Sequence, residues 1–339
     1  MWHIYGQSHI LTQLESGLKE GRIAHAYLLA GPPHVGKMTL AINIAQALNC
    51  LQGPGEPCGD CTQCTRISQG QHADVRVVGI GPSEEDGPTR TVIGIDDVKD
   101  VLHQIYLNPY EGRNSIVIFD GAESMSDQAA NALLKTLEEP PDHVTILLLT
   151  TDEDYLLSTI RSRCRLLTLL PAAKNEMVGR LVSENGVESE AAENLARLSR
   201  GCYGWVFEAL KEDQVLQDRD TDLARMLEIC QSGLDKRFTY ASELATMFSR
   251  NRDGVRQILF LWLRWWRDLL LIKEGGGDFV HHTDRSAELE MHRNGLTTIQ
   301  IVNFVKLVNQ TLEALDHNAN PRLALEVLML NLPVAGVKA

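Results

Sequence analysis

The chain has 339 residues, which is enough for two or three domains with separate cores. It is 44% hydrophobic and 23% charged, it has no apolar run that could span a bilayer, and its first residues lack a signal-peptide pattern, so we expect a cytoplasmic protein. The net charge of −13 argues against a protein that coats nucleic acid, and any contact with DNA would be local or shared with partner chains.

The first predicted elements are a helix, a buried strand and a second helix. Apolar residues recur at helical spacing over residues 4–22, and Gly21 ends the pattern. Ala26–Ala30 predicts the first strand of a sheet, and a helix should run from Gly36 to about Leu48.

The loop between this strand and the second helix has the spacing of a phosphate-binding P-loop, with Gly31, Gly36 and Lys37. Such a loop binds phosphate through backbone N–H groups and the positive end of the helix. The next residue should be a Ser or Thr that binds Mg²⁺, but it is Met38, whose thioether cannot replace a hard oxygen ligand. Thr39 comes one position late and should point to another face of the helix. The pattern predicts a degenerate nucleotide site.

Four cysteines follow within fifteen residues, in a segment broken by glycines and prolines: Cys50, Cys58, Cys61 and Cys64. Four thiolates with no open position are typical of a structural Zn²⁺ site. The alternative is a set of free or redox-active thiols, but the sequence lacks the usual redox context, so we favour zinc.

The next predicted elements are a strand at Val75–Ile80, a helix capped by Asp96, and a buried strand at Ser115–Asp120. In P-loop ATPases the Asp that ends this strand holds Mg²⁺ through water, and a following Glu polarises the attacking water. Here Gly121 follows Asp120, and we expect Glu123 to have the wrong reach. A terminal Asp is often only a loop anchor, so the missing base is the more informative feature.

Asp127–Glu139 predicts a strong helix that two prolines end, and Val144–Thr150 and Leu166–Leu170 predict two more strands. Strands that alternate with helices in this way predict a parallel α/β sheet with the P-loop at its carboxyl edge. Residues 1–170 would form this α/β domain, with the cysteine segment 50–64 as a zinc module.

After Pro171 no strand is predicted. Residues 171–211 predict a small domain of three short helices, and residues 212–339 predict a longer all-helical domain. The tryptophan-rich run 258–273 contains charged residues, so we expect core or subunit-interface packing rather than a membrane segment.

These features together resemble the bacterial clamp-loader AAA+ family, the ATPase assembly that opens the sliding clamp of the replicative DNA polymerase. The resemblance is carried by HAYLLAGPPHVGK, LNC with CGDCTQC, NALLKTLEEPPDHVTILLLTT, the triplet Ser162-Arg163-Cys164, and NPRLALEVL near the end. It implies an AAA+ P-loop domain, a helical lid at 171–211 and a helical collar for oligomerisation at 212–339.

The resemblance also implies which kind of subunit this is. The motor subunits carry a P-loop Thr, an acidic pair after the core strand, and a lid Arg that senses nucleotide, whereas this chain has Met38, Gly121 and glycine within residues 201–204. Arg163 of the triplet remains. This combination is similar to a subunit that does not turn over ATP but lends an arginine finger to its neighbour.

The implied partners are the gamma/tau motor and delta subunits, the sliding clamp and primer–template DNA through the complex. ATP or ADP could still bind without hydrolysis at Gly31, Gly36, Lys37, Thr39 and Asp120. Two alternatives stay open. The first is an ATP-hydrolysing motor of the gamma/tau type. The second is a zinc-module DNA-binding protein on a P-loop scaffold, although the cysteine segment has little positive charge.

Overall fold

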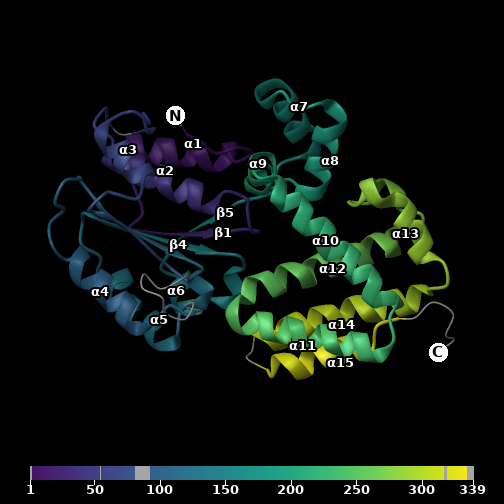
Figure 1. The fold of residues 1–339 in the computed structure, drawn as a ribbon. Helices are drawn as coiled ribbons and strands as arrows, with labels where there is room; N and C mark the ends of the chain where they lie inside the picture. The colour runs from purple at the N-terminus through teal and green to yellow at the C-terminus, as the bar shows by residue number, and fades with distance from the viewer. Residues whose placement is uncertain (1, 54, 81–91, 317–318, 334–339) are drawn as a thin grey trace. The chain divides into compact units, whose positions relative to one another are not determined.

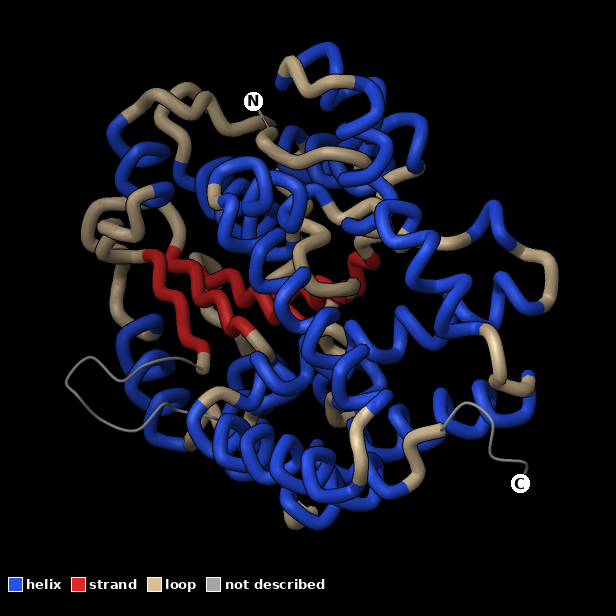
Figure 2. The backbone as a smooth tube through the Cα atoms, turned by 45° about the vertical axis from the view of Figure 1, so that its right-hand side comes forward, coloured by secondary structure: helices blue, strands red, loops and turns tan. Residues whose placement is uncertain are grey.

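Five short strands form one sheet in the computed structural model, which describes residues 2–53, 55–80, 92–316 and 319–333 (Figures 1 and 2). Their order across the sheet is β2-β3-β4-β1-β5, and every neighbouring pair is parallel. The predicted parallel α/β sheet is therefore confirmed. The strands are β1 (Ala26–Ala30), β2 (Val75–Gly79), β3 (Ser115–Asp120), β4 (Val144–Thr150) and β5 (Arg165–Thr168).

Helices cover both faces of this sheet (Figure 1). Alternate residues of β1 face opposite layers, so Tyr27 and Leu29 pack with α1 and α2, while Ala26 and Leu28 pack with α4 and α5. Both faces are buried, which explains why the central strands are apolar throughout. The helices of this part are α1 (Ser8–Lys19), α2 (Lys37–Asn49), α3 (Thr62–Ser68), α4 (Ile95–Ile105), α5 (Asp127–Glu138), α6 (Ser158–Arg161) and α7 (Lys174–Asn185), with short 3-10 turns η1 (Ala122–Ser124) and η2 (Glu153–Tyr155).

The helix α1 was predicted to begin too early, and the strand β5 was predicted to end too late. Gln7 lies at both of these ends. The Gln7 side chain donates to Leu170 O (2.6 Å) and accepts from Leu170 N (3.3 Å). Gln7 is also the N-cap residue of α1, which begins at Ser8 rather than at residue 4. Since the Gln7 amide satisfies the Leu170 backbone, strand pairing stops at Thr168.

The prediction that Asp96 caps α4 was wrong. The cap is Gly94, whose N–H donates to Asp97 Oδ2 at 2.9 Å. Asp97 stands at the third helical position and satisfies the donor in the manner of a capping box. Asp96 is left within the first turn, where its charge still favours the helix N-terminus.

The rest of the chain is helical, as predicted. Three short helices, α7, α8 (Ser189–Ser199) and α9 (Tyr203–Lys211), come first. The helices that follow are α10 (Asp213–Gln231), α11 (Leu234–Arg250), α12 (Arg252–Lys273), α13 (Ser286–Arg293), α14 (Thr298–Asp316) and α15 (Pro321–Leu330), with η3 (Gly277–Phe279) and η4 (Thr283–Arg285). Trp262, Trp265 and Trp266 are all fully buried in this core, which confirms core packing for the tryptophan-rich run.

The chain divides into two compact units. One comprises residues 1–187 and 199–206, and the other comprises residues 188–198 and 207–339. The division into an α/β domain, a lid at 171–211 and a collar at 212–339 stays a prediction, and 317–318 and 334–339 lie outside the described residues. Among the helices that the structure describes, none combines the length and apolar character needed to cross a membrane.

Candidate functional site

The P-loop lies between β1 and α2, as the motif predicts. Its turn needs unusual backbone angles: His34 has φ of 60° and Gly36 has φ of 105°. Both values lie in the left-handed region that favours glycine. At Gly31 a Cβ would stand 2.6 Å from Leu169 O, so glycine there permits the close approach of the loop to the segment after β5. Gly31 and Gly36 are therefore required by the fold of the loop itself.

The Lys37 side chain folds back onto its own loop. Its Nζ donates to Gly31 O at 2.6 Å and to Pro32 O at 3.0 Å. Burial lowers the pKa of Lys37, and the nearby carboxylates of Glu123 and Asp120 oppose that shift. The ammonium therefore already has carbonyl acceptors within the loop and two acidic neighbours.

Glu123 lies within the short 3-10 turn η1 after β3, and its charge acts on Lys37. The expectation that its reach does not suit a catalytic base stays a prediction. Its Oε1 accepts from Thr151 N (3.1 Å) and Thr151 Oγ1 (2.8 Å), at the end of β4. Asp120 ends β3, and the pKa of its carboxyl is raised by partial burial and by Glu123, while Lys37 lowers it. Two carboxylates thus face one lysine at this edge of the sheet.

The residues after Lys37 do not rebuild the usual metal site. Met38 is partly buried and packs against the core cluster between the sheet and α1 and α2. Thr39 is exposed on the first turn of α2. Burial of its thioether explains why Met38 suits the helix, but it offers no hard ligand for Mg²⁺.

The first turn of α9 packs directly on the P-loop. Gly204 N donates to His34 O at 2.9 Å, and a Cβ at Gly204 would stand 2.7 Å from the same oxygen. Cys202 is buried and lies near Lys37. Gly201 also has no room, since its Cβ would meet Ala172 O at 2.3 Å. A lid arginine at either glycine would not fit this arrangement.

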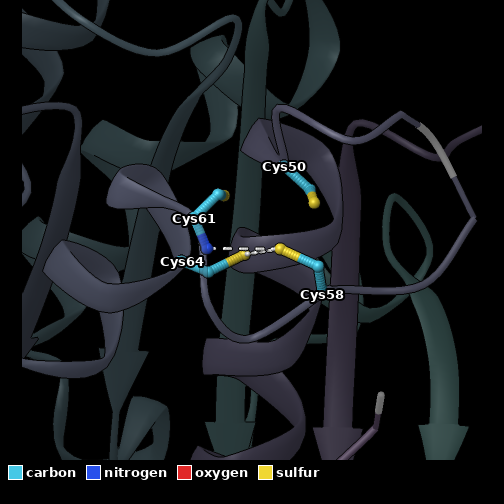
Figure 3. A group of neighbouring side chains, drawn as sticks. All are labelled: Cys50, Cys58, Cys61 and Cys64. Atoms are coloured by element: carbon cyan, nitrogen blue, oxygen red, sulfur yellow. Dashed lines mark hydrogen bonds between the residues drawn. The ribbon is translucent and has the colours of Figure 1, made fainter.

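The four cysteines of the predicted zinc module gather around one small space (Figure 3). Cys50 directly follows α2, and Cys58 lies in the loop between α2 and α3. Cys61 is the N-cap residue of α3, and Cys64 lies within that helix. All four Sγ atoms lie within 4.8 Å of one another, and those of Cys58 and Cys64 are 3.9 Å apart. In a tetrahedral zinc site with Zn–S bonds of about 2.3 Å, sulfur atoms are about 3.8 Å apart. The donor set fits a structural zinc ion.

Hydrogen bonds support this cysteine cluster. Burial acts to raise the pKa of Cys61, but backbone N–H groups of Leu51 and Cys64 outweigh it and lower the pKa to about 6. Burial raises the pKa of Cys64. The buried Gln46 of α2 donates to Cys64 O at 2.9 Å, which ties α3 to the P-loop helix. A preorganised thiolate site next to α2 would stiffen this part of the fold.

Arg163 follows α6, before β5, and its guanidinium is held by nearby acceptors. Its Nη1 donates to Thr159 O at 2.9 Å and contacts Ser162 Oγ at 3.4 Å, and its Nη2 donates to Glu138 Oε1 at 2.6 Å. The Arg163 side chain is 34% exposed and the Glu138 side chain 51%. Arg163 is therefore ordered but accessible.

The sequence model of a family described as "DNA polymerase III, delta subunit" matches residues 6–173. The DNA polymerase III subunit delta' of Bacillus subtilis is 27% identical over 329 residues, which are 96% of this chain and 96% of that protein.

Other relatives match a shorter part. The DNA polymerase III subunit gamma of Buchnera aphidicola is 42% identical over 162 residues, 48% of this chain and 42% of that protein. The subunit tau of Escherichia coli is 43% identical over 162 residues, 48% of this chain and 24% of that protein. This chain therefore spans less than half the length of these gamma and tau relatives.

A solved structure, a DNA polymerase III gamma subunit-related protein of Thermotoga maritima, covers 96% of this chain and 97% of that chain, at 19% identity and a TM-score of 0.44. The relatives similar in sequence, both along the whole chain and over its shorter matched part, are DNA polymerase III subunits. With the matched family model, they show that this chain belongs to the bacterial clamp-loader family of DNA polymerase III subunits.

Proposed function

We propose that this chain is a delta′-type subunit of the DNA polymerase III clamp loader, which helps to load the sliding clamp onto primed DNA. The observation that carries the proposal is similarity to a delta' subunit over 96% of both chains. The partners in this proposal are the gamma/tau and delta subunits, with the clamp and the primer–template DNA engaged through the complex.

The first part of the proposal is that this subunit does not hydrolyse ATP in its own P-loop. Hydrolysis needs a metal ligand beside Lys37 and a base that activates water. Met38 is partly buried and packs against the core, Gly121 occupies the position after the strand Asp, and Lys37 donates to carbonyls of its own loop. Gly204 lies against His34 and leaves no space for a lid arginine. Any ATP or ADP held here would be a structural ligand.

The second part is that Arg163 acts in trans on the ATP site of a neighbouring motor subunit. A guanidinium supplied from outside stabilises charge on the transferring phosphoryl group and is worth about 10³–10⁵ in rate in phosphoryl-transfer systems. Arg163 is partly exposed and ordered by three contacts, which suits a group that must reach another chain. The helices of residues 212–339 would join the oligomerisation collar.

The experiment is ATP turnover by the purified chain, alone and then assembled with gamma/tau, delta, clamp and primed DNA. We expect no turnover by the chain alone. In the complex, Arg163→Ala should sharply reduce turnover without loss of assembly. Arg161→Ala is the matched control, because Arg161 is a neighbouring arginine paired with Asp154. Unchanged turnover in an intact Arg163→Ala complex would remove Arg163 from the mechanism.

We also propose that Cys50, Cys58, Cys61 and Cys64 hold one structural zinc ion. The support is the Sγ separations, which suit tetrahedral thiolate ligation. In this proposal the ion fixes the loop after α2 and has no open coordination position for catalysis.

A second candidate function is that of an ATP-hydrolysing gamma/tau-type motor. It is favoured by the 42–43% identity to gamma and tau over 162 residues. This candidate predicts that the isolated chain hydrolyses ATP and that Lys37→Ala abolishes the activity. Absence of both turnover and Mg²⁺-dependent nucleotide binding would exclude it.

A further inference from the structure

The contact between Arg163 and Glu138 joins two segments that are distant in the sequence. Glu138 is the last residue of α5, and Arg163 follows α6, twenty-five positions later. Their Nη2–Oε1 distance is 2.6 Å, a charge-assisted hydrogen bond of the strong kind. The end of α5 therefore determines where the guanidinium lies.

This contact does little for the stability of the fold. Glu138 is 51% exposed and Arg163 is 34% exposed, so water screens the pair. Exposed pairs of this kind typically contribute between zero and about 1 kcal/mol. A role in presenting Arg163 explains the short contact better than a role in folding does.

The contact also leaves the guanidinium able to bind another acceptor. The Arg163 side chain has five N–H donors. Thr159 O, Ser162 Oγ and Glu138 Oε1 use at most three of them within the described part of the chain. At least two donors thus stay available for phosphate oxygens, while the side chain is already confined to one place. An arginine that is ordered before docking loses less side-chain entropy on binding.

We propose that Glu138 is a positioning residue for Arg163, which holds the guanidinium in the place from which it reaches the neighbouring subunit's ATP. This inference rests on the proposed trans-acting role of Arg163. Glu138 itself would not touch the nucleotide. Its carboxylate acts through Arg163, and its loss would let the side chain move among several conformations, most of them unproductive.

The test uses the reconstituted complex with clamp and primed DNA, and it measures kcat and KM for ATP. We expect Glu138→Ala to lower kcat about tenfold with little change in KM, because misplacement of a transition-state group affects the chemical step. Glu138→Gln retains the length and an oxygen acceptor, so it should restore most of the rate. Glu139→Ala is the matched control, since it removes the neighbouring exposed carboxylate.

A double-mutant comparison separates positioning from a general structural effect. On the Arg163→Ala background, Glu138→Ala should cause no further loss, because the residue that it positions is already absent. The melting temperature of each single variant should stay within about 2 °C of the parent chain, as expected for a screened surface pair.

Each other outcome has a definite meaning. A reduced rate with Arg163→Ala but a parental rate with Glu138→Ala would overturn this inference alone. A higher rate with Glu138→Ala would also overturn it, because Glu138 would then compete with phosphate for Arg163. No effect of Arg163→Ala in an intact complex would contradict the proposed function, and this inference with it.

Discussion

His292 should make the stability of the helical unit depend on pH. Its Nδ1 accepts a hydrogen bond from Trp265 Nε1 at 3.0 Å, and burial lowers its pKa from the ordinary 6.5 to about 4. Protonation would place a proton on the atom that Trp265 needs as an acceptor, in a site that is partly shielded from water. The folded chain therefore keeps His292 neutral well below the pH at which the unfolded chain protonates it.

The sign and size of the effect follow from linkage. Between pH 6.5 and pH 4 the unfolded state binds more protons at this position, so stability is complete above pH 6.5 and falls as the pH is lowered. From pH 7 to pH 5 the shift in the pKa of His292 corresponds to a loss of about 2 kcal/mol in the free energy of unfolding. The pKa of His282 is also lowered by burial, against the opposing Asp268, and it adds to the same trend.

The perturbation is His292→Gln, which keeps an acceptor for Trp265 but does not titrate. Urea unfolding at pH 7 and pH 5, followed by tryptophan fluorescence, gives the two free energies; three of the five tryptophans lie in α12. The variant should lose about 2 kcal/mol less than the parent chain on acidification. His9→Gln, at an exposed position of α1, is the control. Equal losses in the parent and His292→Gln, or an NMR titration of His292 near 6.5, would refute the reasoning.

Cys61→Ser should abolish the expected one equivalent of zinc, measured by elemental analysis of the purified chain, and a full equivalent in that variant would contradict the four-cysteine site. Asp268→Ala should lower the free energy of unfolding by about 3–5 kcal/mol, because the buried carboxylate accepts from His281 N, His282 N and His282 Nδ1; a loss under about 1 kcal/mol would count against this. Lys37→Ala should leave ATP turnover by the assembled complex near the parental value, and a collapse would favour the motor candidate.

The sequence predicted the interior of the α/β unit better than its edges. The bounds of β1, β3 and β4 agree with the predicted ones, because central parallel strands are apolar on both faces and their pattern stops sharply. Edge strands lack this signal. Strand β2 is partly exposed along its length. Beyond the end of β5, the backbone of Leu170 bonds to the Gln7 side chain. Such a side-chain contact across more than 160 residues leaves no local trace in the sequence.

The candidate site was predicted in the same uneven way. The spacing of residues in the sequence was enough to predict the P-loop and the cluster of four cysteines, because both involve residues that are close in the chain. The position of Glu123 relative to Lys37 depends on how the 3-10 turn after β3 folds. The contact of Gly204 with His34 joins residues that are far apart in the sequence, so it depends on the tertiary fold. The relation of Glu138 to Arg163 also comes from packing between α5 and α6, which periodicity does not report.

The retained glycines and lysine of the P-loop have a structural explanation that does not involve catalysis. Gly36 has a left-handed φ, and Gly31 allows close approach to Leu169, so other residues would strain the turn between β1 and α2. Lys37 satisfies two loop carbonyls that would otherwise lack these donors. A chain can therefore lose the metal ligand and the base while selection on folding alone keeps the motif. For this reason the P-loop spacing is weak support for ATP hydrolysis here, and Met38, Gly121 and Gly204 are the more informative residues.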